Sequence, residues 1–172
     1  MADLRTCSAI AILAAAAAAV PSAAAAGERP VRVAADFYGR LISPDRSEPA
    51  QTAFVALAPF LGEELHQALL AYDAYERACA RITPAGIKPY MLDQSPFFLA
   101  PDGAKAMLEA SQRLHGDVAR VSVALAYDDV RWTDTVLLGK QRGRWAILDI
   151  RWQEGGSLTE RLVAFASHRC TP

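Results

Sequence analysis

A long alternation of apolar with small or polar residues dominates the C-terminal half of this chain, and it restricts the fold more than any other feature. Alternation with a period of two is typical of strands that bury one face. Turn-forming residues interrupt it at positions 115–117, 128–129 and 141–143. The sequence therefore predicts an antiparallel meander of about four strands. Its alternating apolar positions are Val121, Val123, Leu125, Tyr127, Trp132, Val136, Leu138, Trp145 and Ile147.

The segment from Ala104 to Leu114 precedes the meander and admits two interpretations. Met107, Leu108 and Leu114 can share one face of a helix. The same segment can form the first strand, closing a hairpin at residues 115–117. We favour the strand, because a glycine turn directly precedes a clear strand.

Helical patterns flank the predicted sheet on both sides. Pro30 opens a first helix, because proline is tolerated in the first turn. A short helix over 52–57 precedes a longer one, whose first turn we assign to Pro59 and which we expect to cover the sheet. A proline-rich, apolar loop over 82–103 should fold across the mouth of the sheet. Ser157 and Glu160 form a capping box that begins a last helix. These patterns predict an α+β fold, with N-terminal helices on a curved antiparallel sheet and a short C-terminal helix.

The N-terminus has the pattern of a secretory signal peptide. Arg5 is followed by an unbroken apolar run from Ala9 to Val20, and small residues lie at 23–26. The run is shorter than the roughly 20 residues of a spanning helix, and Cys7 lies on the wrong side of it for a lipoprotein anchor. We expect cleavage after residue 26, a single domain over 27–172, a periplasmic or secreted location and no membrane anchor in the mature protein.

Cysteine usage agrees with an oxidising compartment. Cleavage removes Cys7 and leaves Cys79 and Cys170, an even pair. We predict a disulfide between them; two separate buried thiols are the alternative.

Charge and motifs exclude several classes of function. The formal net charge is −1, so electrostatic capture of nucleic acid is not expected. Glycine loops for phosphate, nucleophile elbows and zinc motifs are absent from the sequence. The histidines, His66, His115 and His168, lack a metal-binding spacing. We expect no metal and no cofactor.

A few residues remain as candidates for a site. Strict alternation puts Asp134 on the face of Trp132, and Asp149 on the face of Trp145. A carboxylate on an apolar face has either a raised pKa or a partner. The alternatives are acid–base chemistry, or a structural bond to a backbone N–H or an arginine; a bulge would turn either side chain outward. The candidate ligand-binding aromatics, which can equally serve as packing, are Tyr72, Tyr90, Trp132 and Trp145.

The order of elements also resembles a known family. It ends in the run Trp145-Ala-Ile147-Leu-Asp149-Ile150, followed by Gly155-Gly156-Ser157-Leu158 at a helix start. From about Val33 to Phe165 the chain is similar to small secreted bacterial proteins of a domain-of-unknown-function family, within the cystatin-like, nuclear transport factor 2-like superfamily. The resemblance implies a cone, in which a curved sheet wraps a long helix and one end stays open. It carries over no catalytic motif, and fold analogy alone does not give function.

Three functions follow as hypotheses. The first is a non-enzymatic module that binds a small molecule or an envelope protein through the mouth of the cone. The second is an envelope isomerase or hydrolase with Asp134 or Asp149 as base, assisted by Tyr72 or Tyr90. The third is an inhibitor or immunity protein against an envelope-targeted toxin, acting through the Tyr90–Phe98 loop. A homodimer is compatible with all three.

Overall fold

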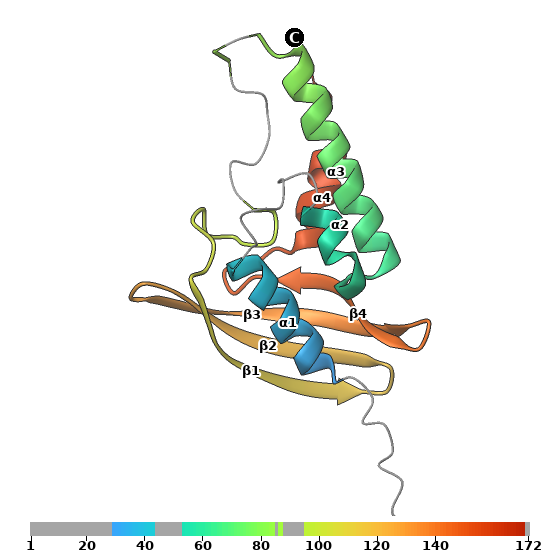
Figure 1. The fold of residues 1–172 in the computed structure, drawn as a ribbon, viewed down its shortest axis with the longest axis vertical. Coiled ribbons are helices and arrows are strands. Elements are labelled where there is room, and N and C mark those ends of the chain that lie inside the picture. The colour runs from blue at the N-terminus through green and yellow to red at the C-terminus, as the bar shows by residue number, and fades with distance from the viewer. Residues whose placement is uncertain (1–28, 44–52, 85, 88–94, 171–172) are drawn as a thin grey trace, which may run out of the picture.

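The computed structural model describes residues 29–43, 53–84, 86–87 and 95–170 (Figure 1). Four α-helices, a short 3-10 turn and four strands follow one another along the chain, and the strands are consecutive. The predicted α+β class is confirmed. The elements are α1 (Pro30–Ile42), α2 (Ala53–Leu57), η2 (Ala58–Phe60), α3 (Glu63–Ile82), β1 (Ala106–His115), β2 (Val118–Tyr127), β3 (Val130–Gln141), β4 (Arg144–Arg151) and α4 (Leu158–Ala166).

The sheet is an antiparallel meander with the strand order β1-β2-β3-β4. The segment with two interpretations is a strand, and each predicted break is a tight hairpin turn. Arg142 and Gly143 join β3 to β4 and both have positive φ, 52° and 81°. Positive φ at both central residues matches the right-handed twist of the strands, which explains the turn residues at this position.

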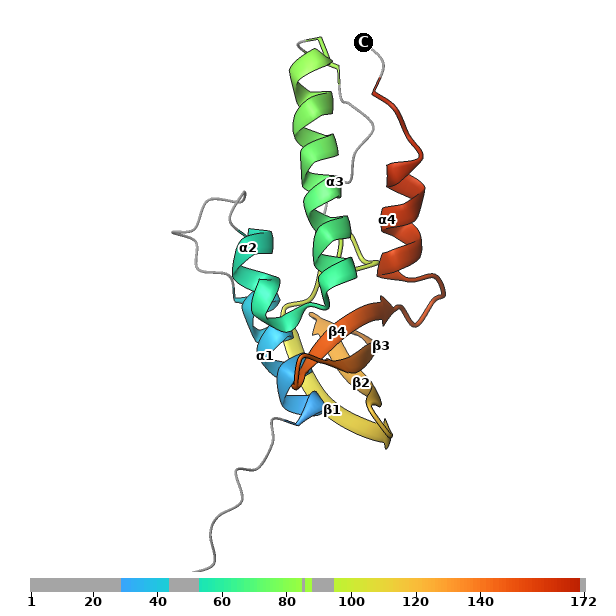
Figure 2. The same cartoon turned by 90° about the vertical axis from the view of Figure 1, so that its right-hand side faces the viewer.

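The first helix, α1, covers the inner face of the sheet (Figures 1 and 2). It contacts β1, β2 and β4. At its N-terminus, where backbone donors lack helical partners, the Val31 N–H donates to the Gln112 side chain of β1 at 2.9 Å. The apolar side chains of α1 that are buried in this layer are Val33, Ala34, Phe37 and Tyr38.

The long helix α3 does not cover the sheet, so that expectation is wrong. Its main neighbour is α4, and it meets the sheet at β4. Figure 2 shows α3 and α4 side by side, projecting away from the strands. The apolar stripe of α3 is shared with α4: the Tyr72 and Phe165 rings lie 5.0 Å apart. An amphipathic stripe identifies a helix with a buried face, but it does not identify the partner.

Helix α3 begins at Glu63 rather than at Pro59. Between them, Leu61 is extended and bridges Ile147 of β4, and the Gly62 N–H donates to the Ile147 carbonyl at 2.8 Å. A Cβ on Gly62 would lie 2.9 Å from Leu148. Proline fits the short 3-10 turn η2 as well as it fits the first turn of an α-helix. The pairing of Leu61 with β4 then separates η2 from α3.

A disulfide connects the outer end of α3 to the tail that follows α4. Cys79 and Cys170 are bonded, with 5.3 Å between their Cα atoms, as predicted. At the inner end of α4, the Ser157 hydroxyl accepts from the Glu160 N–H at 3.3 Å, which confirms the predicted cap. The two helices are therefore joined at one end and anchored to the sheet at the other.

Within the described ranges, no helix has the length and apolar character needed to cross a membrane.

Candidate functional site

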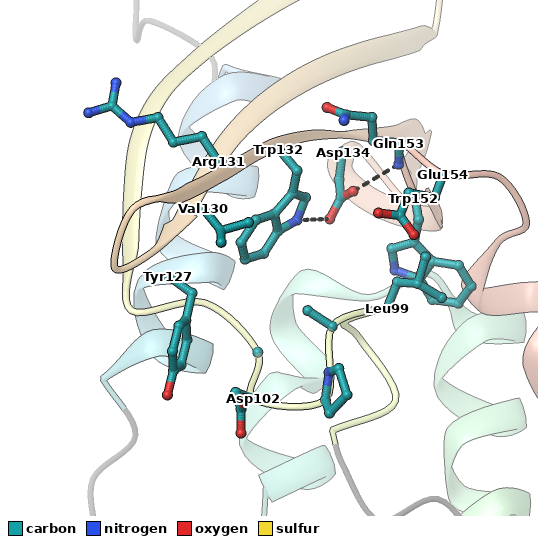
Figure 3. Close-up of a pocket in the computed structure, with 13 residues that line it drawn as sticks. Leu99, Asp102, Tyr127, Val130, Arg131, Trp132, Asp134, Trp152, Gln153 and Glu154 are labelled. Atoms are coloured by element: carbon teal, nitrogen blue, oxygen red, sulfur yellow. Dashed lines mark hydrogen bonds between the residues drawn. The ribbon is translucent and has the colours of Figure 1, made fainter.

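A pocket of about 410 Å³ opens between the β2–β3 hairpin and the Leu99–Gly103 segment (Figure 3). Its walls are the loop, the end of β2, the start of β3 and the residues after β4. The pocket therefore lies at the strand ends and not between α3 and the sheet. Its volume falls within the range of small-molecule sites, about 300–1,000 Å³. Its lining residues are Leu99, Ala100, Pro101, Asp102, Gly103, Tyr127, Val130, Arg131, Trp132, Asp134, Trp152, Gln153 and Glu154.

Asp134 is the buried charge of this pocket. Its side chain has no exposed surface, because β3 directs it to the inner face opposite Val123. The Trp132 indole N–H donates to one carboxylate oxygen at 3.2 Å, and the Gln153 backbone N–H donates to the other at 3.2 Å. Burial raises the pKa of Asp134 to about 6, and these two hydrogen bonds oppose the rise.

The two outcomes predicted as alternatives for Asp134 thus occur together. Its carboxylate accepts a hydrogen bond from a backbone N–H, and its pKa is also raised. Both of its donors are neutral, and none of the ion pairs among the described residues includes it. At neutral pH the pocket wall therefore contains a carboxylate whose charge no cation of the described chain compensates directly.

Tyr38 of α1 adds a second buried polar group near Asp134. Its hydroxyl has no hydrogen-bond partner among the described residues. Burial raises the pKa of Tyr38 well above its ordinary value, and the negative charge of Asp134 raises it further. An unsatisfied buried hydroxyl is costly. Two polar groups, Tyr38 and Asp134, thus lie buried near each other beside the pocket.

Two side chains bind the backbone of residues 96–98, directly before the Leu99–Gly103 segment. The Trp152 indole N–H donates to the Phe97 carbonyl at 3.1 Å. Arg161 of α4 donates to the Pro96 and Phe98 carbonyls at 3.0 and 2.8 Å, and its guanidinium lies 4.1 Å from the Trp152 ring centre. Three successive carbonyls are thus bonded, so the backbone that leads into the pocket wall is fixed. Of the predicted 82–103 loop, residues 99–103 lie beside the strand ends and line this pocket, whereas residues 82–84 end and follow α3, and residues 85 and 88–94 lie outside the described residues.

Asp149, the other candidate carboxylate, lies outside the pocket. A bulge between Leu137 and Leu138 shifts the register, so that Asp149 pairs with Leu137 and lies on the outer face. One of its oxygens accepts from the Thr159 N–H at 3.0 Å and the Thr159 hydroxyl at 2.8 Å. Asp149 therefore stabilises the first turn of α4, and its predicted place on the Trp145 face is wrong because the alternation breaks at the bulge.

The candidate aromatics are separated from one another. Trp132 lines the pocket. Trp145 is buried at the other end of the sheet, with Lys140 5.5 Å from its ring centre. Tyr72 is buried between α3 and α4, where its hydroxyl donates to Glu76. Tyr90 lies outside the described residues.

The sequence-based candidates did not include several residues of the pocket. Trp152 and Gln153 follow β4, and Tyr127 ends β2. Trp152 could have been found from the sequence, because it lies two positions after Ile150 and alternation then predicts that both side chains point to the inner face. No local sequence pattern predicts the contact between residues 99–103 and the strand ends, because it forms only when the loop folds back onto the sheet.

A second hollow, of about 590 Å³, lies on the other side of the same loop and shares Pro101, Asp102 and Gly103 with the first. Asp102 is its one charged lining residue among those described. In the described part of the chain, no three His, Cys, Asp or Glu side chains gather in a way that could hold a metal ion.

We find no match to this chain among protein-family models, curated proteins or solved structures. The site is an apolar, aromatic hollow with one buried carboxylate among its described lining residues. Its described lining contains no serine, threonine, cysteine, histidine or lysine, the usual nucleophiles and bases.

Proposed function

We propose that this protein is a binding module that holds a small, largely apolar molecule between the β2–β3 hairpin and the Leu99–Gly103 segment. The observation that carries this function is the pocket itself: a preformed hollow of about 410 Å³ with apolar and aromatic walls around a few polar groups. Such hollows are typical of ligand sites. The clamp formed by Trp152 and Arg161 supports it further, since preorganised walls lower the entropic cost of binding.

Catalysis by Asp134 is the second candidate, because a carboxylate with a pKa of about 6 is suited to proton transfer near neutral pH. Two observations favour binding over it. Asp134 has no exposed surface and both of its oxygens accept hydrogen bonds. The inhibitor hypothesis is less favoured, since Phe97 and Phe98, the described end of its loop, are buried rather than presented to a partner.

We also propose that the mature protein works outside the cytoplasm, and that its fold belongs with the cystatin-like, nuclear transport factor 2-like superfamily. The Cys79–Cys170 disulfide supports the location. A helix lying on a four-stranded antiparallel sheet supports the fold proposal. N-terminal sequencing of protein exported by a bacterial host tests the location: a mature chain starting at Gly27 is expected, and an uncleaved chain retained in the cytoplasm contradicts it.

Titration with N-phenyl-1-naphthylamine, a neutral apolar dye whose fluorescence rises in dry sites, tests the binding function. We expect saturable binding at one site per chain. Val130 is exposed at the rim, and Val118 is a matched exposed valine at the opposite end of β2. Val130→Phe should narrow the opening and weaken dye binding, whereas Val118→Phe should not. Absence of saturable binding, or equal effects of the two variants, contradicts the proposal.

A further inference from the structure

We propose that the ligand of this pocket is an organic cation, an ammonium group carried on an apolar body. The inference rests on the proposed binding function and adds the chemical class of the ligand. It depends on two features of the described lining: the sign of its charges, and an aromatic ring, Trp132, over which no described cation lies.

The charges of the lining are mostly negative. Asp134 lies in the wall, and the exposed residues Asp102 and Glu154 lie at the rim. Arg131 is the single basic residue of the described lining. Because it alternates with Val130 and Trp132 along β3, its side chain leaves on the outer face, and Figure 3 shows it pointing away from the pocket. An anion would meet three carboxylates here, so the lining selects against it.

The aromatic rings of the site bind cations within the protein itself. Lys105 lies 4.1 Å from the Tyr127 ring centre, and Arg161 lies 4.1 Å from that of Trp152. Trp132 is different, because no described cation lies over its ring. Its indole N–H is directed to Asp134, which leaves its π-face available. Indole is the best aromatic partner of an ammonium group.

Trp132 and Asp134 act together on such a ligand. The indole face gives the direct contact, and the carboxylate behind it supplies the compensating charge without needing contact, since Coulomb attraction is strong where water is excluded. In return, the ligand relieves a buried carboxylate whose two hydrogen-bond donors are both neutral. A neutral molecule of the same shape obtains the apolar burial and none of the charge compensation.

Displacement of the bound dye by two molecules of one shape tests this. Benzyltrimethylammonium carries the charge, and neopentylbenzene replaces its nitrogen by carbon. At pH 7.5 we expect the cation to bind at least about tenfold more tightly, the ratio given by about 1.4 kcal/mol. Asp134→Asn should remove most of that preference. Asp117→Asn is the matched control: it also removes one negative charge, from the exposed β1–β2 turn, where asparagine is suitable.

A second measurement separates charge from shape. The preference should fall as the pH is lowered from 7.5 to 5, because Asp134 becomes protonated, while the affinity of the neutral molecule stays constant. The other ionisable groups near Asp134 are Tyr38 on α1 and the lining residues Asp102, Arg131 and Glu154, while Arg161 of α4 lies over the Trp152 ring.

The outcomes distinguish this inference from the function on which it rests. If the dye binds and the two molecules displace it with equal affinities, the inference of a cationic ligand is wrong, but the proposed binding function stands. The inference is also wrong if Asp134→Asn keeps the preference for the cation over the neutral molecule, or if Asp117→Asn lowers that preference as much as Asp134→Asn does. If the dye, the cation and the neutral molecule all fail to bind, both proposals fail.

Discussion

The indole N–H of Trp132 donates to the carboxylate of Asp134, two residues further along β3, at 3.2 Å. An ionised carboxylate accepts a stronger hydrogen bond than a protonated one. We therefore expect the Trp132 indole proton resonance to move downfield as the pH rises, with a midpoint of about 6. The Trp152 indole, which donates to the Phe97 carbonyl, is the internal control. A Trp132 resonance that does not respond between pH 4 and 8, or that moves together with Trp152, contradicts the assignment.

The same carboxylate should make stability depend on pH. The pKa of Asp134 is raised to about 6 in the folded protein from an ordinary value of 3.8, so the native state binds more protons than the unfolded state between these values. The contribution of Asp134 is most favourable below pH 4, declines as the pH rises to 6, and is fully lost above it. The loss is about 3 kcal/mol at most.

Urea unfolding at several pH values measures this dependence. Other carboxylates titrate in the same range, so the quantity to follow is the difference between the wild-type protein and Asp134→Asn. That difference should change between pH 4 and 6 and remain constant from pH 7 to 8. A flat difference across the whole range would show that the carboxylate titrates alike in both states.

Arg161 should determine whether the pocket wall is ordered. Arg161→Met removes two charge-assisted hydrogen bonds to the Pro96 and Phe98 carbonyls, each worth about 1.5–3 kcal/mol in comparable proteins. We expect faster amide exchange over 96–103 and weaker dye binding. Arg169→Met is the matched control, since Arg169 is exposed near the C-terminus. Unchanged exchange over this segment would show that Trp152 holds the wall alone.

The disulfide should be a major source of stability. It joins residues 91 positions apart, and the chain-entropy model gives about 4–5 kcal/mol as an upper value for such a loop. A Cys79→Ala, Cys170→Ala double variant should unfold at a clearly lower temperature, and amides of α4 should lose protection first. Reduction of the wild-type protein should have the same effect; a lower stability in the variant than in the reduced protein would point to lost packing instead.

Arg113 and Arg120 face each other directly on the outer side of the sheet. Like charges in this position are destabilising. Replacing Arg120 by Glu should therefore raise the free energy of unfolding by about 0.2–1 kcal/mol, and the gain should shrink at high salt. Arg120→Gln, which removes the repulsion without adding an attraction, should give a smaller gain. Equal gains for Glu and Gln would show that no cross-strand ion pair forms.

The elements that could be predicted are those whose signals are local. The hairpin turns, the strand at Ala106–His115, the Ser157 cap and the inward direction of Asp134 all follow from residues a few positions apart. Period-two alternation and turn chemistry are sufficient for such features.

The features that could not be predicted depend on how distant segments meet. An apolar stripe on α3 did not reveal that α4, rather than the sheet, would cover it. Strict alternation misplaced Asp149, because a single bulge in β4 reverses every later side chain. One wall of the pocket consists of residues 99–103, which return to the strand ends, and no local pattern encodes that return.

The place of α1 has a consequence for the order in which the protein can fold. This helix is synthesised before the strands against which Phe37 and Tyr38 are buried, which come from 106–151. Its apolar face therefore has no partner until most of the chain has been synthesised. The four strands, in contrast, are joined by two-residue turns and can pair as soon as each emerges. Both α1 and α3 are thus made well before the segments that cover them, so their apolar faces are exposed to aggregation while the chain is still incomplete.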